Sequence, residues 1–124
     1  FPEEGRIEAS ERFIPKNFLG QPYLTSAYRV DYRIDERQIQ LFVVDTGSPE
    51  EAQSHFSRLE DFYRAQGQGT VDVETTQDPP MLIVDGSSKM VVFQLDHRLG
   101  GAICIKSLDG GRAAAAALAE KMRR

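Results

Sequence analysis

The side chains of this chain with the greatest potential for catalysis or metal binding are two histidines, His55 and His97, and one cysteine, Cys104. Imidazole nitrogens and thiolates bind Zn²⁺, and the same groups act as base and nucleophile in hydrolysis. However, the sequence has no HxxH or HxH pattern, and a lone cysteine cannot form a multi-cysteine site. The spacing favours ordinary, partly exposed histidines. We therefore predict no metal site and no cofactor.

Cys104 lies in the apolar segment Ala-Ile-Cys-Ile, which is typical of the interior of a strand. Burial raises the pKa of a thiol and makes it inert, so this position favours a structural cysteine. A nucleophile paired with a distant histidine is the alternative. A single cysteine also excludes a disulfide within this chain.

Glycine-rich segments could hold a phosphate at the start of a helix, and Gly110-Gly111 precedes a helical pattern. The P-loop and GxGxxG patterns are absent from the sequence. The nearest glycine pair, Gly67 and Gly69, also follows a predicted helix rather than a strand. Asp109 would repel a phosphate, so helix capping explains the glycine pair. The sequence also lacks a GxSxG elbow, and we assign no catalytic or ligand-binding residue.

The elements that must position these side chains are clearest in residues 41–63. An apolar run leads to Ser48, a predicted N-cap, with Pro49 at the first helical position and Glu51 completing a capping box. Apolar residues then recur at helical spacing, namely Ala52, Phe56, Leu59 and Tyr63. We predict a strand that leads into an amphipathic helix, which ends at Gly67 and Gly69.

Alternating apolar residues predict an antiparallel hairpin of residues 23–34 with 39–45. A four-residue loop would pair Ile34 with Ile39 and Val30 with Val43, leaving arginines and aspartates on the outer face. That outer face carries Arg29, Asp31 and Arg33. A polar groove at the start of the first strand would be lined by Tyr23, Thr25 and Arg29.

Further strands are predicted in the second half of the chain, at residues 70–74, 81–84, 90–95 and 102–105. A three-residue turn with Gly100 in the left-handed conformation would place Leu95 opposite Ile103 and Gln94 opposite Cys104. Both faces of the last strand are then apolar, which indicates a central position. An alanine-rich helix follows over residues 112–124.

These elements predict one α+β domain over residues 1–124. Its antiparallel sheet has five to six strands in the order strand, strand, helix, strands, helix, with both helices packed on one face. Residues 1–20 form an irregular lead-in that packs on the core.

The net charge of −4 argues against nucleic-acid binding. The terminal Lys121, Arg123 and Arg124 complement the end of a helix dipole. No apolar run approaches the ~20 residues of a membrane span. Because the sequence starts at Phe1, we expect that a signal peptide or a preceding domain has been removed.

Several short segments, read in order, resemble an uncharacterised bacterial domain-of-unknown-function family of predicted secreted or envelope proteins. They are Ser10-Glu11-Arg12-Phe13, Asn17-Phe18-Leu19-Gly20, Tyr28-Arg29-Val30-Asp31-Tyr32, Gly47-Ser48-Pro49-Glu50-Glu51-Ala52 and Arg98-Leu99-Gly100-Gly101. The resemblance covers most of the chain and corresponds to the second half of an internally duplicated pattern. It implies an extracytoplasmic location but no activity.

We therefore predict a non-enzymatic binding or interaction module of a bacterial extracytoplasmic protein. Its partner is a protein or the other half of the same polypeptide. A structural half of a duplicated two-lobe protein and an enzyme with scattered site residues are the alternatives. A histidine bonded to a carboxylate in a cleft would favour the enzyme, and a binding module should have no acid–base pair in a deep pocket.

Overall fold

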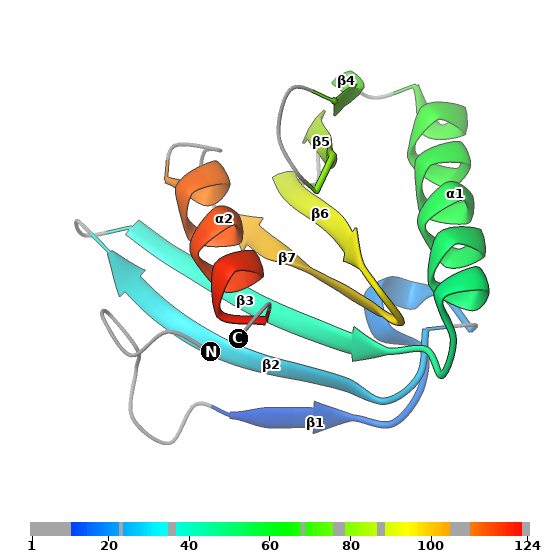
Figure 1. Cartoon of the computed structure of the whole chain (residues 1–124). Helices are drawn as coiled ribbons and strands as arrows, with labels where there is room; N and C mark the ends of the chain where they lie inside the picture. Colours follow the sequence, from blue (N-terminus) through cyan, green and yellow to red (C-terminus); the bar gives the residue numbers. More distant parts are fainter. Residues whose placement is uncertain are drawn as a thin grey trace.

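The computed structural model describes residues 11–22, 24–34, 37–67, 69–75, 79–86, 89–104 and 110–122. Three strands come first, followed by one helix, four more strands and a second helix (Figure 1). The elements are β1 (Arg12–Ile14), a 3-10 turn η1 (Phe18–Gly20), β2 (Ala27–Ile34), β3 (Arg37–Asp45), α1 (Pro49–Gln66), β4 (Gly69–Glu74), β5 (Met81–Gly86), β6 (Lys89–Leu95), β7 (Arg98–Cys104) and α2 (Gly111–Met122).

Within the described residues, the strands join one seven-stranded sheet in the order β1-β2-β3-β7-β6-β5-β4, and every neighbouring pair is antiparallel. The predicted α+β class with an antiparallel sheet is confirmed. The predicted strand count of five to six is too low, because β1 lies inside the segment that we expected to be irregular. A three-residue strand is too short for alternation to reveal it in the sequence.

The two helices pack on opposite faces of this sheet, so the prediction of both helices on one face is wrong. From α1, Leu59 packs with Phe42 and Val92, whereas from α2, Leu118 packs with Leu41 and Val91. Successive strand residues point to opposite faces, so these are the two sides of β3 and β6. Figure 1 shows α2 in front of β3 and β7, with α1 on the other side of the twisted sheet. The physical reason is that the central strands are apolar on both faces, and both faces require cover.

The first hairpin keeps the predicted faces but not the predicted pairing. Val30 pairs with Leu41 and Tyr32 with Ile39, a shift of two residues that leaves the faces unchanged. The predicted four-residue loop is therefore wrong, since only residues 35–36, which lie outside the described residues, separate β2 from β3. The strand also begins at Ala27 rather than at residue 23, because Ser26 has a φ of 56°.

The hairpin of β6 and β7 has a different register from the predicted one. Leu95 pairs with Arg98, and the turn consists of Asp96 and His97, with Asp96 at a φ of 57°. Gly100 lies in the strand and not in the turn. The predicted pairing of Gln94 with Cys104 is wrong, and Gln94 pairs with Leu99 instead. The central position of β7, between β3 and β6, is confirmed.

The start of α1 follows the sequence prediction. The Ser48 side chain accepts a hydrogen bond from the Glu51 backbone N–H at 3.2 Å, and Pro49 occupies the first turn. At the other end, Gly67 has a left-handed φ of 63°. The local chemistry of the cap and of the terminal glycine therefore sets both ends of this helix.

We expect Ser48→Ala to lower the free energy of unfolding by ~1 kcal/mol, because a first-turn N–H loses its acceptor. Ser48→Gly should lower the free energy of unfolding by only a few tenths of a kcal/mol. Urea denaturation midpoints of the two variants measure the difference. Equal destabilisation by alanine and glycine would show that this hydrogen bond does not stabilise the helix.

The helix α2 packs close to the sheet through small side chains. α2 places Ala115 and Ala119 in the core beside Leu118, and an added Cβ at Gly111 would lie 2.5 Å from Cys104 Sγ. Small side chains therefore bring this helix against β7. Residues 123–124 of the predicted helix lie outside the described residues.

Candidate functional site

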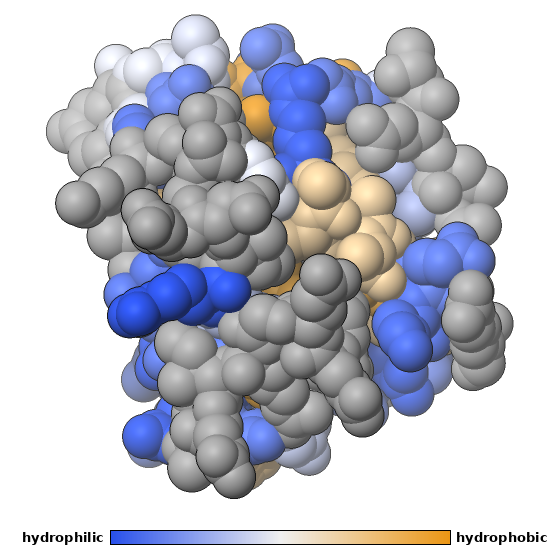
Figure 2. Space-filling model, turned by 90° about the vertical axis from the view of Figure 1, so that its left-hand side faces the viewer, coloured by the Kyte–Doolittle hydropathy of each residue, from blue (hydrophilic) through white to orange (hydrophobic). Residues whose placement is uncertain are grey.

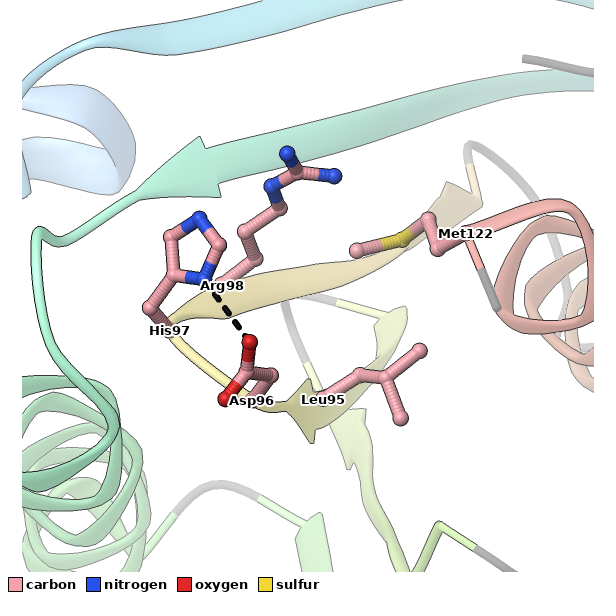
Figure 3. Close-up of a pocket in the computed structure, with 5 residues that line it drawn as sticks. All are labelled: Leu95, Asp96, His97, Arg98 and Met122. Atoms are coloured by element: carbon pink, nitrogen blue, oxygen red, sulfur yellow. Dashed lines mark hydrogen bonds and ion pairs between the residues drawn. The ribbon is translucent and has the colours of Figure 1, made fainter. Parts of the chain in front are cut away.

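A hollow of about 270 Å³ lies between the β6–β7 turn and the C-terminal end of α2 (Figure 3). Its lining residues come from both elements, namely Leu95, Asp96, His97, Arg98 and Met122. Figure 3 shows His97 above Asp96 at one end, with Arg98 extending toward β3 and with Leu95 and Met122 facing from the other end. The hollow combines apolar walls with groups of both charges.

His97 lies between two carboxylates. Its Nδ1 is 3.0 Å from Asp96 Oδ2, and its Nε2 is 3.9 Å from Asp45 Oδ1. The turn is held in place by Thr46, whose hydroxyl and backbone N–H both donate to the His97 carbonyl, at 2.7 and 3.1 Å. Asp96 is 71% exposed, and the hollow is therefore open to solvent on this side.

Among the residues that line the hollow, a histidine lies beside a carboxylate, and no nucleophile accompanies them. A histidine oriented by a carboxylate is a general base when a hydroxyl or thiol lies within reach. None of the five lining residues carries such a group, and the Thr46 hydroxyl donates to main-chain carbonyls. We expected no acid–base pair in a deep pocket; His97 and Asp96 do meet, but in a hollow that is open to solvent on the Asp96 side.

The sequence placed His97 at a hairpin corner beside Asp96 and Arg98, but it did not reveal the approach of Asp45. Asp96 and His97 are adjacent in the chain, but only the two-residue turn places them together at the end of the hairpin. Asp45 joins them because β3 pairs with β7, and Asp45 is the register partner of Arg98. A two-residue turn at Asp96 and His97 would have predicted the cluster. However, Gly100 and Gly101, which follow this turn, favoured a longer loop.

The structure does not bring the other candidate residues to the hollow. His55 lies on α1, where burial and the Arg58 cation lower its pKa and the Glu51 carboxylate raises it. Within the part of the chain that the structure describes, no group of three or more histidine, cysteine or acidic side chains is placed to hold a metal ion.

Cys104 is 5% exposed in the central strand β7, and burial raises the pKa of its thiol. The predicted burial is confirmed. The thiol faces α2 and lies at the opposite end of β7 from the hollow, where Cys104 pairs with Lys89. The predicted inert, structural cysteine is consistent with this position.

We expect a thiol reagent to label Cys104 at least ~100-fold more slowly in the folded protein than in urea, because access requires local opening and deprotonation. The absorbance of the chromophore that the reagent releases measures the labelling rate in the folded protein and in urea. Stoichiometric labelling within seconds under native conditions would show that this thiol is accessible and reactive.

A second surface lies at the β1 edge of the sheet, where Phe13 is 54% and Tyr28 48% exposed. Their rings contact each other at a centroid distance of 5.0 Å and a tilt of 45°. We call this pair the aromatic edge. Tyr28 pairs with the half-buried Val43, and Val43 lies two residues before Asp45, the partner of Arg98. The aromatic edge and the hollow therefore share one face of the sheet.

The opposite face of the same strands is basic. Arg12 pairs with Arg29, Arg33 follows on the same face, and one acidic residue, Asp31, lies between them. Arg29 Nε is 3.9 Å from Asp31 Oδ1, and both side chains are partly exposed. We call these four residues the arginine face. Of the predicted polar groove, Arg29 belongs to this face, Thr25 is exposed, and Tyr23 lies outside the described residues.

A third apolar area lies on α2, where Ala113, Ala116 and Ala117 are exposed. Figure 2 shows an apolar area at the level of α2, bordered by hydrophilic residues. These side chains are small, and they offer little area that a partner could bury. The aromatic edge is therefore the stronger candidate for an interface.

In comparisons with known proteins, no family model, no curated protein and no solved structure matches this chain. Neither α1 nor α2, the helices in the described residues, is long and apolar enough to cross a bilayer.

Proposed function

We propose that this protein is a non-enzymatic interaction module that binds a protein partner through the aromatic edge and the adjoining surface toward the hollow. The observation that carries the proposal is the exposure of two cross-strand aromatic partners at the edge of the sheet, Phe13 on β1 and Tyr28 on β2. Exposed aromatic clusters are typical of binding sites, because their burial supplies much of the binding free energy. Partly exposed apolar residues extend this surface, namely Val43, Leu95 and Met122.

The chemistry of the hollow also supports a binding role. It joins apolar walls to His97, Arg98 and Asp96, which can orient a ligand by hydrogen bonds. The extracytoplasmic location implied by the resemblance remains part of the proposal. Fractionation of cells that produce the full-length gene product tests that location.

The experiment is a selection of displayed random peptides on the wild-type protein. We expect the enriched peptides to lose at least about tenfold in affinity for a Phe13→Ser, Tyr28→Ser variant, because both aromatic contacts are removed. Phe62→Ser is the matched control, since Phe62 is an exposed aromatic residue on α1. Denaturation midpoints establish that the variants fold. Ligands that bind the edge variant as tightly as the wild type would overturn the proposal.

An enzyme is the second candidate function, and the His97–Asp96 distance of 3.0 Å favours it. Its test is turnover of ester, glycoside and peptide substrates by the wild type and by His97→Gln. Activity that His97→Gln abolishes would replace the binding module with an enzyme whose base is His97.

A further inference from the structure

The strand β1 ends the sheet in the described part of the chain, with β2 on one side and no strand on the other. The main chain of such an edge strand can pair with an extended segment of another protein. The aromatic ring of Phe13 belongs to this strand, so the candidate interface and the sheet edge coincide.

The two faces of this edge differ in chemistry. Phe13 and Tyr28 lie on the face that α2 covers elsewhere, and Arg12 and Arg29 lie on the other face. Side chains of an added strand would alternate between these two faces. One set would lie beside Phe13, and the other set would lie beside Arg12.

The charges decide between a second copy of this chain and a different partner. The arginine face carries three positive side chains and one negative side chain, although the whole chain has a net charge of −4. Pairing of two β1 strands would place two such faces side by side, and like charges across neighbouring strands destabilise pairing. An acidic partner would instead gain charge-assisted hydrogen bonds from the guanidinium groups.

We propose that β1 binds an extended peptide segment in which acidic residues alternate with apolar ones, and that this segment adds to the sheet as a further strand. Its apolar side chains pack on Phe13 and Tyr28, and its carboxylates face Arg12 and Arg29. This inference rests on the proposed function and names the class of partner.

The probe is a fluorescein-labelled eight-residue peptide in which glutamate alternates with valine and phenylalanine, and fluorescence anisotropy measures its binding to the full chain. A second peptide carries lysine in place of glutamate. We expect the glutamate peptide to bind at least about tenfold more tightly than the lysine peptide, with a preference that weakens at high salt. Arg12→Glu should reverse that preference, and Phe13→Ser should weaken both peptides.

Strand addition has its own test, because the backbone N–H groups of alternate residues point to opposite edges of an extended peptide. One version is N-methylated on its glutamates and another on its apolar residues. We expect one version to lose binding and the other to retain it, because only one edge pairs with β1. Binding of both versions, or of neither, would overturn strand addition.

The failures of the two proposals are distinguishable. Equal binding of the glutamate and lysine peptides, or no binding of either, overturns the acidic-peptide inference. If peptides selected from the random library still depend on Phe13 and Tyr28, the proposed interaction module survives that result. Denaturation midpoints of Arg12→Glu and Phe13→Ser, both exposed in the native protein, serve as the folding control.

Discussion

Gly101→Ala is expected to lower the free energy of unfolding by about 3 kcal/mol, at the upper end of what overpacking a core costs. Gly101 is buried in β7 between Phe42 on β3 and Val92 on β6. An added Cβ would collide with the Val91 main-chain oxygen and lie 3.0 Å from the Phe42 ring. The oxygen belongs to the central strand β6, and relief of the collision would displace the sheet itself.

Urea denaturation of the variant and the wild type measures this effect. Gly67→Ala is the matched control, because Gly67 has a positive φ of 63° but no atom within 4 Å of its added Cβ. The control should cost ~1 kcal/mol, from backbone strain alone. If Gly101→Ala costs no more than the control, the sheet accommodates the methyl group and the close approach of β6 and β7 is not required.

Phe93→Ala is expected to lower the free energy of unfolding by about 3–5 kcal/mol, which is the usual cost of removing a buried phenyl ring. Phe93 is fully buried on the α2 face and packs in the same core cluster as Leu118. Its ring lies over Gly100, where an added Cβ would come within 2.5 Å of the Phe93 Cζ. The cavity left by alanine has no neighbouring side chain on Gly100 to fill it.

A double-mutant cycle tests the packing of this ring on Gly100. Gly100→Ala alone should destabilise the protein by about 1–3 kcal/mol, because the ring must move. In the Phe93→Leu background the same substitution should cost at least ~1 kcal/mol less, since the shorter side chain leaves room for a methyl group. Additive effects of the two substitutions would show that Gly100 and Phe93 do not constrain each other.

The sequence by itself determined the features that depend on neighbouring residues. Ser48, Pro49 and Gly67 specified both ends of α1, because capping involves atoms only a few residues apart. Alternation of apolar residues determined that Val30 and Tyr32 share a buried face with Ile39 and Leu41, since a shift of two residues preserves the faces. It did not reveal that Phe42 and Val44 are buried on the other face of β3. The interior position of Cys104 followed in the same way from its apolar neighbours.

The tertiary structure decided the features that depend on distant parts of the chain. Gly100 and Gly101 fit either a turn or close packing, and the contacts with Phe93 and Val91 place them in the strand. That shift moves the turn to Asp96 and His97, and pairing with β3 then brings Asp45 beside His97.

The placement of the helices and the composition of the sheet edge also depend on distant parts of the chain. The central strands are apolar on both sides, but the sequence does not specify which face each helix covers, because that choice depends on connections across the whole sheet. In the structure β7 lies between β3 and β6, and Leu59 and Leu118 pack on opposite faces of the resulting sheet. Phe13 and Tyr28 come together because three residues pair with β2 at the edge, a contact too short to leave a periodic pattern in the sequence.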